Sequence, residues 1–454
     1  MEKEKNIPGK KSRILSEELS SYECHNITAI SSNGPIFWQQ AKGVHVWDVD
    51  GNKYLDLSGG FGVAALGYRH PKIYRSLLNQ LDTLWHVMGD VYPSKEKVEL
   101  CRLLSQITFE KWENQRGKVI LGCTGSDAIE AALKTAFFHT KKNKFITFYG
   151  GYHGLSLGAL AVNGLDDFRK PLEGLYAPIA SFLPYPSCID CIDKSQSLTQ
   201  KDCLCEPLFE EKLEKMIHEG YGAILFEPLQ GRGGIVVPPD WFLPLLRRMS
   251  TKHNILLIAD EIFTGLYRTG KRFGCDVAGI VPDIICLGKS MAGAFPISAC
   301  IGRENVMDSW PKNDGEAIHT STFLGNPIGC RMAIEQIKEL EKKHEQLFIE
   351  EKGEYFLSLL NNLSKRFNCL KNPRGKGLFL GVDIVDEKGC PAPEIAAKIV
   401  IKMLQKGIIV LTEGPFRNVL SFTPPLIISF KQIGSVVRIL EQIIKIVLKE
   451  TKWS

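Results

Sequence analysis

Three short, mainly apolar runs in the middle of the chain most constrain its fold. They occupy residues 223–226, 255–259 and 283–286. Runs of this length and composition are typical of strands that are buried on both faces, as in a parallel sheet covered by helices on both sides. A helical pattern separates the first two runs, at residues 241–252. The sequence therefore predicts an α/β domain built on a mainly parallel sheet.

The pattern along the rest of the chain divides the 454 residues into three segments. Residues 1–70 are predicted to form an N-terminal arm and a small hairpin, with strands at residues 35–38 and 44–48. Residues 71–326 are predicted to form the large domain. Residues 327–454 are predicted to form a smaller α+β domain, to which the N-terminal segment also contributes.

Composition and charge exclude several classes of partner. The chain is 44% hydrophobic and 24% charged, which is ordinary for a soluble globular protein. Its net charge of +5 comes with lysines gathered at both ends of the chain, which argues against a nucleic-acid-binding face. No apolar run approaches the roughly 18–20 residues of a membrane span. Because the opening residues also lack the apolar core of a signal peptide, we expect a cytoplasmic protein without nucleic-acid or membrane partners.

Four of the thirteen cysteines cluster in a predicted insertion at about residues 186–206, namely Cys188, Cys191, Cys203 and Cys205. Four thiols within so short a segment could hold a zinc ion, although the second pair has C-x-C spacing rather than the usual C-x-x-C. The alternative is a surface insertion that carries reduced cysteines, as is normal for a cytosolic protein. The sequence leaves both interpretations open.

A lysine and an aspartate lie at the ends of two predicted buried strands. Asp260 ends the run at residues 255–259, and Lys289 follows the run at residues 283–286. Ligands of open α/β sheets bind beyond the carboxyl ends of the strands. Buried charges are costly, and breaking such a pair typically costs about 3–5 kcal/mol. Chemistry with pyridoxal phosphate needs both groups, since it uses a lysine amine and an aspartate that pairs with the pyridinium nitrogen.

Three further polar or glycine-rich corners are expected at the same edge of the sheet, at residues 122–127, 149–154 and 227–234. The first corner comes directly before a helix, and its glycines and hydroxyls are suited to hold a phosphate at the helix N-terminus. It lacks the lysine of a P-loop, so a nucleoside triphosphate is not indicated. The second corner contains Tyr152, an aromatic ring that can stack on a flat cofactor. Together the corners favour one cofactor pocket.

With these motifs the sequence resembles the class III (ω-amino acid) aminotransferases, which are pyridoxal-phosphate enzymes of fold type I. The resemblance covers about residues 20–448 and implies a seven-stranded, mainly parallel sheet in the large domain. The matching segments follow one another in the order Thr124–Ala128, Tyr152–Gly154, Glu227–Gly231, Ala259–Gly265, Arg268–Gly270, Leu287–Lys289 and Ser321–Pro327.

The resemblance implies a role for each residue around the ring of the cofactor. Lys289 is expected to form the Schiff base and then to move a proton between the substrate and the cofactor. Asp260 is expected to pair with the ring nitrogen, and Tyr152 to stack on the ring. His153 is expected among the cofactor-binding residues, and Glu227 is expected to help arrange the cofactor. No metal ion is expected in this site.

The resemblance also implies how the phosphate is held. Gly125 and Ser126 are expected to bind it in their own chain, and Thr322 to reach it from a second subunit, which implies a homodimer with a shared active site. One residue departs from the pattern. Many relatives have a glutamine where this chain has Phe263, and that glutamine hydrogen-bonds the ring hydroxyl of the cofactor. We therefore do not include Phe263 in the polar site.

The reaction implied is amino-group transfer by a ping-pong mechanism through the Lys289 Schiff base. The donor would be an amine, a diamine or an ω-amino acid that carries a terminal amino group, and the acceptor would be an oxo acid. The alternative on the same scaffold is a lyase that eliminates ammonia or phosphate. A binding or regulatory module that lost catalysis is a third class, which Lys289 and Asp260 argue against.

The substrate side of the pocket departs from relatives that are specific for amino acids. These often carry two carboxylate-binding arginines, at positions where this chain has Leu155 and Ser421. Neither residue can form the bidentate pair that a carboxylate prefers. We hypothesise that Arg232 binds the carboxylate of the oxo acid instead; a rim arginine with a surface partner is the alternative. Asp90 either recognises the distal ammonium of a diamine or caps the turn before Pro93.

Overall fold

The computed structural model describes residues 7–30, 34–187, 205–312 and 315–451. The chain forms two compact units. The large unit comprises residues 72–349, and the small unit combines residues 1–71 with residues 350–454. Three of the four cysteines of the predicted insertion, at positions 188, 191 and 203, lie outside the described residues.

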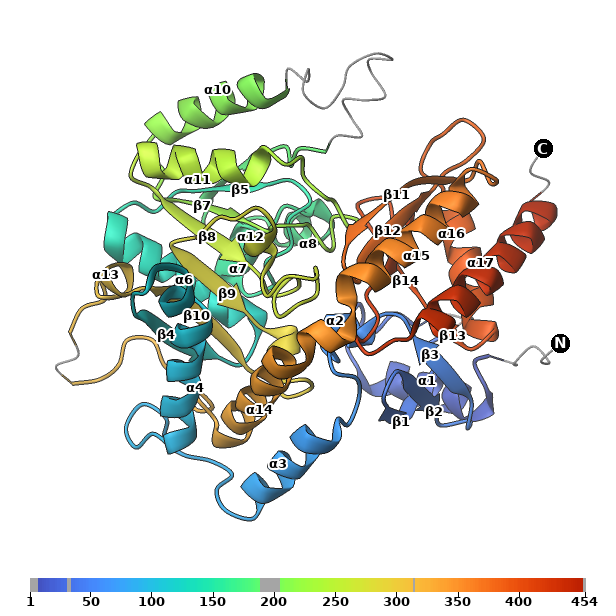
Figure 1. The fold of residues 1–454 in the computed structure, drawn as a ribbon, viewed down its shortest axis with the longest axis horizontal. Coiled ribbons are helices and arrows are strands. Elements are labelled where there is room, and N and C mark those ends of the chain that lie inside the picture. The colour runs from blue at the N-terminus through green and yellow to red at the C-terminus, as the bar shows by residue number, and fades with distance from the viewer. Residues whose placement is uncertain (1–6, 31–33, 188–204, 313–314, 452–454) are drawn as a thin grey trace. The chain divides into compact units, whose positions relative to one another are not determined.

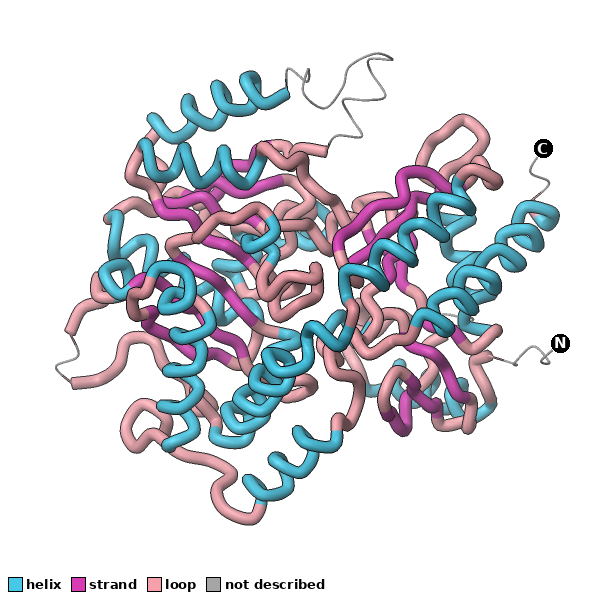
Figure 2. Tube along the Cα trace, in the orientation of Figure 1, coloured by secondary structure: helices cyan, strands magenta, loops and turns pink. Residues whose placement is uncertain are grey.

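A seven-stranded sheet forms the centre of the large unit (Figures 1 and 2). Its strands lie in the spatial order β4 (Gly117–Gly122), β10 (Ser298–Arg303), β9 (Ile284–Leu287), β8 (Leu256–Asp260), β7 (Ala223–Phe226), β5 (Phe145–Phe148) and β6 (Ala180–Leu183). β10 runs antiparallel to both of its neighbours, whereas the pairs from β9 to β6 are parallel. The α/β fold class and the mainly parallel seven-stranded sheet predicted from the sequence are therefore confirmed.

Helices surround this sheet and connect its strands. The α-helices of the large unit are α3 (Pro71–Leu81), α4 (Lys95–Ile107), α5 (Phe109–Glu113), α6 (Gly125–Thr140), α7 (Leu157–Ala161), α8 (Asp166–Arg169), α10 (Cys205–His218), α11 (Phe242–Lys252), α12 (Gly274–Val277), α13 (Glu304–Met307) and α14 (Pro327–Lys343). The described residues of this unit also form three short 3-10 helices, η1 (Lys170–Leu172), η2 (Lys289–Met291) and η3 (His344–Leu347). Cys205, the fourth cysteine of the predicted insertion, is the first residue of α10.

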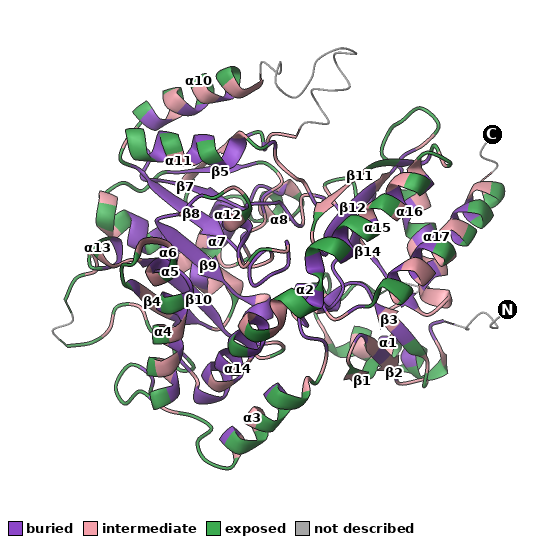
Figure 3. Cartoon of the chain, in the orientation of Figure 1, coloured by how far each residue is buried: buried purple, intermediate pink, exposed green. Residues whose placement is uncertain are grey.

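Both faces of the sheet are buried, as the continuous apolar runs predict (Figure 3). Successive side chains of a strand point to opposite faces. In β8, Leu257 and Ala259 pack with α10 and α11, while Leu256 and Ile258 pack on the other face with the alanine-rich side of α6. A strand between two such layers cannot alternate apolar and polar residues, because each face needs apolar side chains. This packing fixes the position of the strand ends that carry Asp260 and Lys289.

The boundary between the two units differs from the one that we predict. The sequence places residues 327–454 in the small domain, whereas α14 belongs to the large unit. α14 packs on α4 there, and its Arg331 and Lys338 form ion pairs with Glu99 of α4 at 3.2 and 2.9 Å. Packing on a helix more than two hundred residues earlier in the chain is not visible in the local sequence, so helical periodicity alone could not assign α14.

The small unit contains two four-stranded sheets. Its elements are α1 (Lys10–Tyr22), β1 (Trp38–Lys42), β2 (His45–Asp48), β3 (Lys53–Asp56), α2 (Gly59–Gly62), α15 (Ile349–Ser364), β11 (Leu370–Lys376), β12 (Phe379–Ile384), α16 (Pro393–Gln405), β13 (Ile408–Ile409), β14 (Leu411–Glu413), β15 (Val419–Phe422) and α17 (Phe430–Glu450). The predicted first strand at residues 35–38 is shifted, because β1 begins only at Trp38. Pro35 has no N–H to donate to the ladder.

Both chain ends build this unit, as the sequence predicts. β13, from the C-terminal part, pairs in parallel with β3 from the N-terminal part, with Ile408 opposite Leu55. Among the described residues, no helix combines the length and the apolar character that crossing a bilayer requires.

Candidate active site

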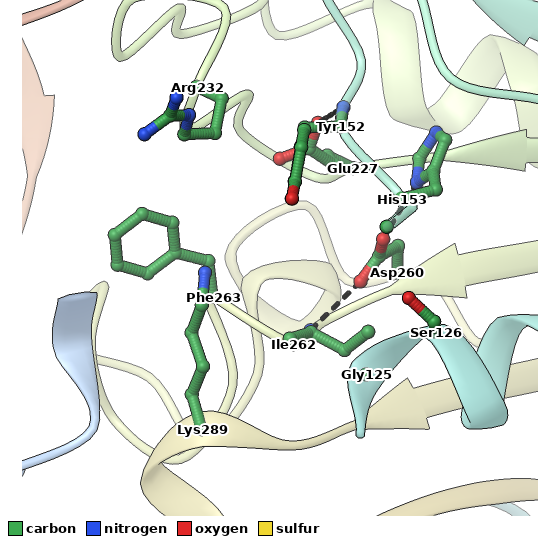
Figure 4. Close-up of a pocket in the computed structure, with 11 residues that line it drawn as sticks. Gly125, Ser126, Tyr152, His153, Glu227, Arg232, Asp260, Ile262, Phe263 and Lys289 are labelled. Carbon is green, nitrogen blue, oxygen red and sulfur yellow. Dashed lines mark hydrogen bonds and ion pairs between the residues drawn. The ribbon is translucent and has the colours of Figure 1, made fainter. Parts of the chain in front are cut away.

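Lys289 lies one residue beyond the end of β9, after Gly288, at the first position of η2. Its backbone φ is +39°, in the left-handed region that residues other than glycine rarely adopt. Such strain costs on the order of 1–3 kcal/mol and is concentrated at functional sites, where the surrounding structure maintains it. The strained backbone directs the half-buried side chain into a cavity, where its Nζ lies 3.5 Å from the centroid of the Phe263 ring (Figure 4).

Asp260, the last residue of β8, is held by a buried histidine. Its Oδ2 lies 2.7 Å from Nδ1 of His153, and its Oδ1 accepts a hydrogen bond from the backbone N–H of Ile262 at 3.0 Å. The side chain of Asp260 is 3% exposed and that of His153 is 1% exposed. Because an ionised carboxylate can only accept, the shared proton lies on Nδ1 of His153. His153 is therefore a positioning residue that fixes and stabilises the carboxylate.

The N-terminus of α6 forms the third part of the cavity. Thr124 is the N-cap residue, and its hydroxyl and the Asp127 carboxylate form a capping box. The box fixes the first turn, so that Gly125 and Ser126 line the cavity at the positive end of the helix dipole. A 16-residue helix that begins at a cavity in this way is suited to hold a phosphate.

Gly154 allows its loop to approach α6 very closely. Its φ is +119°, and a Cβ at this position would meet Oγ of Ser126 at 2.0 Å. The next residue, Leu155, donates its N–H to the same oxygen at 3.2 Å. A residue with a side chain would therefore push the loop away from the N-terminus of α6 and widen the phosphate cradle.

Glu227 follows β7 and organises two loops at the edge of the cavity. Its Oε1 accepts a hydrogen bond from the N–H of Tyr152 at 2.9 Å, and its Oε2 accepts one from the N–H of Gly231 at 3.0 Å. Burial raises the pKa of the Glu227 carboxyl. Through these two bonds Glu227 fixes the loop that carries Tyr152 and the turn that carries Arg232.

Arg232 lies against two aromatic rings. Its guanidinium carbon is 5.6 Å from the ring centroids of both Tyr152 and Phe168. The rings of Tyr152 and Phe168 meet edge to face, with centroids 5.5 Å apart. A guanidinium can stack on aromatic faces, and its planar fork of N–H groups matches the geometry of a carboxylate.

These side chains enclose one cavity of about 200 Å³, which Figure 4 shows. Its lining brings together eight residues that the sequence predicts for the site, namely Gly125, Ser126, Tyr152, His153, Glu227, Arg232, Asp260 and Lys289. Two predicted residues do not line it in their own chain. Thr322 is exposed. Asp90 is also exposed, and its carboxylate accepts a hydrogen bond from the Thr320 hydroxyl at 2.8 Å.

Three residues line the cavity in addition to the predicted ones, namely Gly154, Ile262 and Phe263. Phe263 contributes no polar group, in agreement with its exclusion from the polar site, but its ring lies against the Lys289 amine. Ile262 and Phe263 follow Asp260 in the chain, so the turn after β8 brings them to the cavity. Their position directly after Asp260, at the predicted end of a strand, is the sequence signal that could have indicated that they line the cavity.

The two positions at which relatives specific for amino acids often carry carboxylate-binding arginines are uncharged in this chain. Leu155 is 50% exposed and is not among the residues that line the cavity. Ser421 lies in β15 of the small unit, is 4% exposed and pairs with Gly381 and Leu411. Arg232 is therefore the arginine of the large unit that lines the cavity.

Comparison with known proteins assigns the family. A sequence model of the family described as Aminotransferase class-III matches residues 27–444. The chain belongs to this family. Among curated relatives of this class-III aminotransferase, the alanine/serine racemase of Pyrococcus horikoshii is 32% identical over 417 residues, which cover 90% of this chain and 86% of the racemase. The 4-aminobutyrate aminotransferase of Escherichia coli is 32% identical over 411 residues, which cover 90% of this chain and 93% of that enzyme.

A solved structure supports the same assignment. An amine transaminase from an uncultivated Pseudomonas species, determined in the pyridoxal-phosphate-bound form, superposes with a TM-score of 0.84 at 26% identity and covers 94% of this chain and 99% of that protein. Class-III aminotransferases depend on pyridoxal 5'-phosphate, so the cofactor, the enzyme class and amino-group transfer predicted from the sequence are confirmed. The residues also fit the cofactor: a helix N-terminus for its phosphate, a buried carboxylate for its ring nitrogen and an amine for its aldehyde.

We predict that the Gly154→Ala variant of this class-III aminotransferase binds pyridoxal phosphate more weakly. The new Cβ would overlap Oγ of Ser126. Overpacking of this kind costs about 1–3 kcal/mol, which corresponds to roughly a 5- to 150-fold rise in the dissociation constant. Equilibrium titration of the apoenzyme with the cofactor measures the change.

Gly174→Ala is the matched control. Gly174 has a similar backbone φ of +100°, but a Cβ there meets no atom within 4 Å. The Gly174→Ala variant should therefore have a similar backbone strain without a steric clash of the kind expected between residue 154 and Ser126. Equal cofactor affinity in the two variants would contradict the role of Gly154.

Proposed function

We propose that the protein transfers the amino group of an amine or ω-amino acid to an oxo acid, with pyridoxal phosphate held by Lys289. One observation supports this proposal above the others. The amine of Lys289, the Asp260–His153 pair and the N-terminus of α6 line one cavity at the carboxyl edge of the sheet. Each group matches one part of the cofactor, and together they leave space on the side of Arg232 for a substrate.

The chemistry divides between the cofactor and the protein. When bound, pyridoxal phosphate supplies a conjugated ring that accepts electrons from the substrate carbon that bears the amine. Lys289 would hold the cofactor at its aldehyde through Nζ. With substrate bound, the same amine would move the proton of the substrate carbon that bears the amino group. The Phe263 face beside this amine excludes water from it on one side.

Asp260 keeps the ring nitrogen protonated. His153 donates to Oδ2 of Asp260, and the Ile262 N–H donates to Oδ1, so both oxygens are fixed before the cofactor arrives. The low dielectric constant of the buried site strengthens the attraction between the carboxylate and a protonated ring nitrogen. Tyr152 stacks on the ring, Gly125 and Ser126 bind the phosphate, and Glu227 orients the Tyr152 loop through its bond to the Tyr152 N–H.

We expect the Lys289→Ala variant to lose both the visible absorbance of the bound cofactor and amino transfer. The wild-type holoenzyme, incubated with an amine donor alone, should release one equivalent of carbonyl product per site and then stop until an oxo acid is added. Lys95→Ala is the control, because its side chain is 86% exposed and distant in sequence from the cavity motifs. Continuous release of carbonyl product and ammonia without an oxo acid would instead support the lyase.

Racemisation is a second candidate, because the relative from Pyrococcus horikoshii is an alanine/serine racemase that is 32% identical over 90% of this chain. Both reactions begin with removal of a proton from the carbon that bears the amine, and Lys289 serves both. They differ in whether the proton returns to that carbon. Formation of D-amino acid from L-alanine or L-serine, without an oxo acid and without carbonyl product, would support the racemase over the transferase.

Arg232 is our proposed binding residue for the carboxylate of the oxo acid. It lines the cavity, and the rings of Tyr152 and Phe168 hold its guanidinium. Asp90, by contrast, does not line the cavity in its own chain and bonds to Thr320. Thr320 lies two residues before Thr322, which we propose reaches the active site of a second subunit, so we assign Asp90 no substrate role within its own chain.

The Arg232→Ala variant should raise KM for the oxo acid without a matching rise for an amine donor that lacks a carboxylate. Loss of a charge-assisted hydrogen bond costs about 1.5–3 kcal/mol, or roughly a 10- to 150-fold rise. Arg169→Ala is the matched control, since Arg169 also stacks on an aromatic ring, that of Phe182, but does not line the cavity. An unchanged KM for every oxo acid tested would exclude this role.

A homodimer that shares its active sites is the last part of the proposal. Thr322, expected at the phosphate of a second subunit, is exposed, and the neighbouring Phe323 is 60% exposed. The segment at residues 84–92 contacts this region through the rings of His86 and Phe323. It exposes Trp85, Met88, Val91 and Tyr92 by 56–68%. Exposed large apolar side chains that follow one another so closely in one segment favour a covered interface.

The test is complementation between two defective variants. Thr322→Val should weaken cofactor binding about tenfold, through loss of a hydrogen bond to the charged phosphate. In a mixed dimer of Lys289→Ala and Thr322→Val chains, one site would combine the intact Lys289 of one chain with the intact Thr322 of the other. That site should regain wild-type cofactor affinity. If Thr322 acts within its own chain, no site of the mixed dimer regains wild-type cofactor affinity. A monomer in analytical ultracentrifugation would also refute a shared active site.

A further inference from the structure

Charged side chains line the seam between α10 and α11, on one face of the large sheet. Arg248 of α11 lies 3.0 Å from Glu210 and 3.8 Å from Glu206 of α10. Lys252, four residues later, lies 2.6 Å from Glu214. Because residues four apart in a helix lie on the same face, the acids of α10 and the bases of α11 form successive ion pairs along the seam.

The pattern changes at the C-terminal end of both helices. His218 lies four residues after Glu214, where an acid would continue the series on α10, and His253 comes directly after Lys252, the last residue of α11. The two imidazole rings lie with centroids 5.2 Å apart and planes at 85°. If both rings were protonated they would repel each other, and as neutral rings each offers a nitrogen that can accept.

His253 Nε2 is the second unusual feature of this end of the seam. The atom is buried and finds no hydrogen-bond partner among the described residues. Oε1 of Glu214 lies 3.3 Å away but in an orientation that does not make a hydrogen bond. Buried polar atoms normally have partners, so one that lacks them calls for an explanation such as an ion.

The three side chains have the geometry of a metal-binding group. Glu214 and His218 are one helical turn apart on α10, and His253, directly after the end of α11, faces them. One ligand atom from each residue lies within 4.8 Å of the other two. Two imidazole nitrogens and a carboxylate oxygen form a common set of ligands for zinc, with water completing a tetrahedron.

We propose that Glu214, His218 and His253 bind a divalent transition-metal ion, for which zinc is the best match. Contraction of the ligand atoms around the ion would need small rotations of side chains on the surface of two packed helices. Lys252 shares Oε1 of Glu214 and therefore competes with the ion. The site is distinct from the four cysteines of the predicted insertion.

The position of the site indicates a structural role. His253 precedes β8 and lies near its amino end, whereas Asp260 ends the same strand at the cavity edge. An ion at Glu214 therefore lies at the opposite edge of the sheet from Lys289 and Asp260. It would join the end of α10 to the end of α11, so its removal should lower thermal stability and leave the cofactor absorbance and amino transfer unchanged.

The test is equilibrium binding of Zn²⁺ alone to the holoenzyme. The background should be a variant in which Cys188, Cys191, Cys203 and Cys205 are replaced by serine, so that thiols cannot supply the signal. We expect one bound zinc ion per chain and a higher melting temperature. His218→Ala and His253→Ala should each weaken binding by about tenfold or more, given that loss of an outer-shell partner alone costs 10- to 100-fold. His25→Ala, at an exposed turn, is the control.

Lys252→Ala keeps the proposal testable even if a histidine variant folds poorly. Removal of the competing ammonium should tighten zinc binding. If the three residues bind no metal, the substitution only removes the ion pair between Lys252 and Glu214, and zinc does not raise the melting temperature of the variant. Co²⁺ added in place of zinc should give visible bands without sulfur charge transfer. Zinc affinity that is unchanged by the His218 and His253 substitutions, or that disappears with the four cysteines, would overturn the proposal.

Discussion

The buried pair formed by Asp260 and His153 is the interaction on which the rest of the site depends. A carboxylate that is 3% exposed at the end of a central strand is stable only if its charge is compensated, and the Nδ1–H of His153 and the Ile262 N–H supply that compensation. Because the pair is fixed in the large sheet, it would define where the ring nitrogen of the cofactor lies in the binding mode that we propose. Lys289, Tyr152 and the N-terminus of α6 then have to be placed relative to that point.

The two-sided burial of the sheet provides this placement. β7 and β8 have apolar residues on both faces, so α6 covers one face while α10 and α11 cover the other. All parallel strands then present their carboxyl ends at one edge, and the loops that follow them meet there. Glu227 links two of those loops, and Gly154 allows one of them, the loop that carries Tyr152, to approach α6. The proposed zinc site uses the same helix layer at the other edge.

Motif residues were the part of the site that the sequence could predict. Lys289, Asp260 and Gly125 each follow or begin a strongly patterned element, so their position at the sheet edge follows from strand direction. The contacts between distant segments could not be predicted in the same way. The stacking of Arg232 on Tyr152 and Phe168 joins two loops and α8, and the packing of α14 on α4 joins helices far apart in the chain. The periodicity of the local sequence contains no information on either of these contacts.

The sequence by itself determined the fold class, the family and the cofactor chemistry of this protein, because apolar runs, helix starts and the Lys289 and Asp260 motifs are local features with a strict chemical meaning. Tertiary structure alone decided which side chains share the cavity: it brought Phe263 against the Lys289 amine and left Asp90 bonded to Thr320. It also decided that Glu214, His218 and His253 meet. The physical reason is that substrate and metal contacts depend on distances between elements, which packing sets and composition does not.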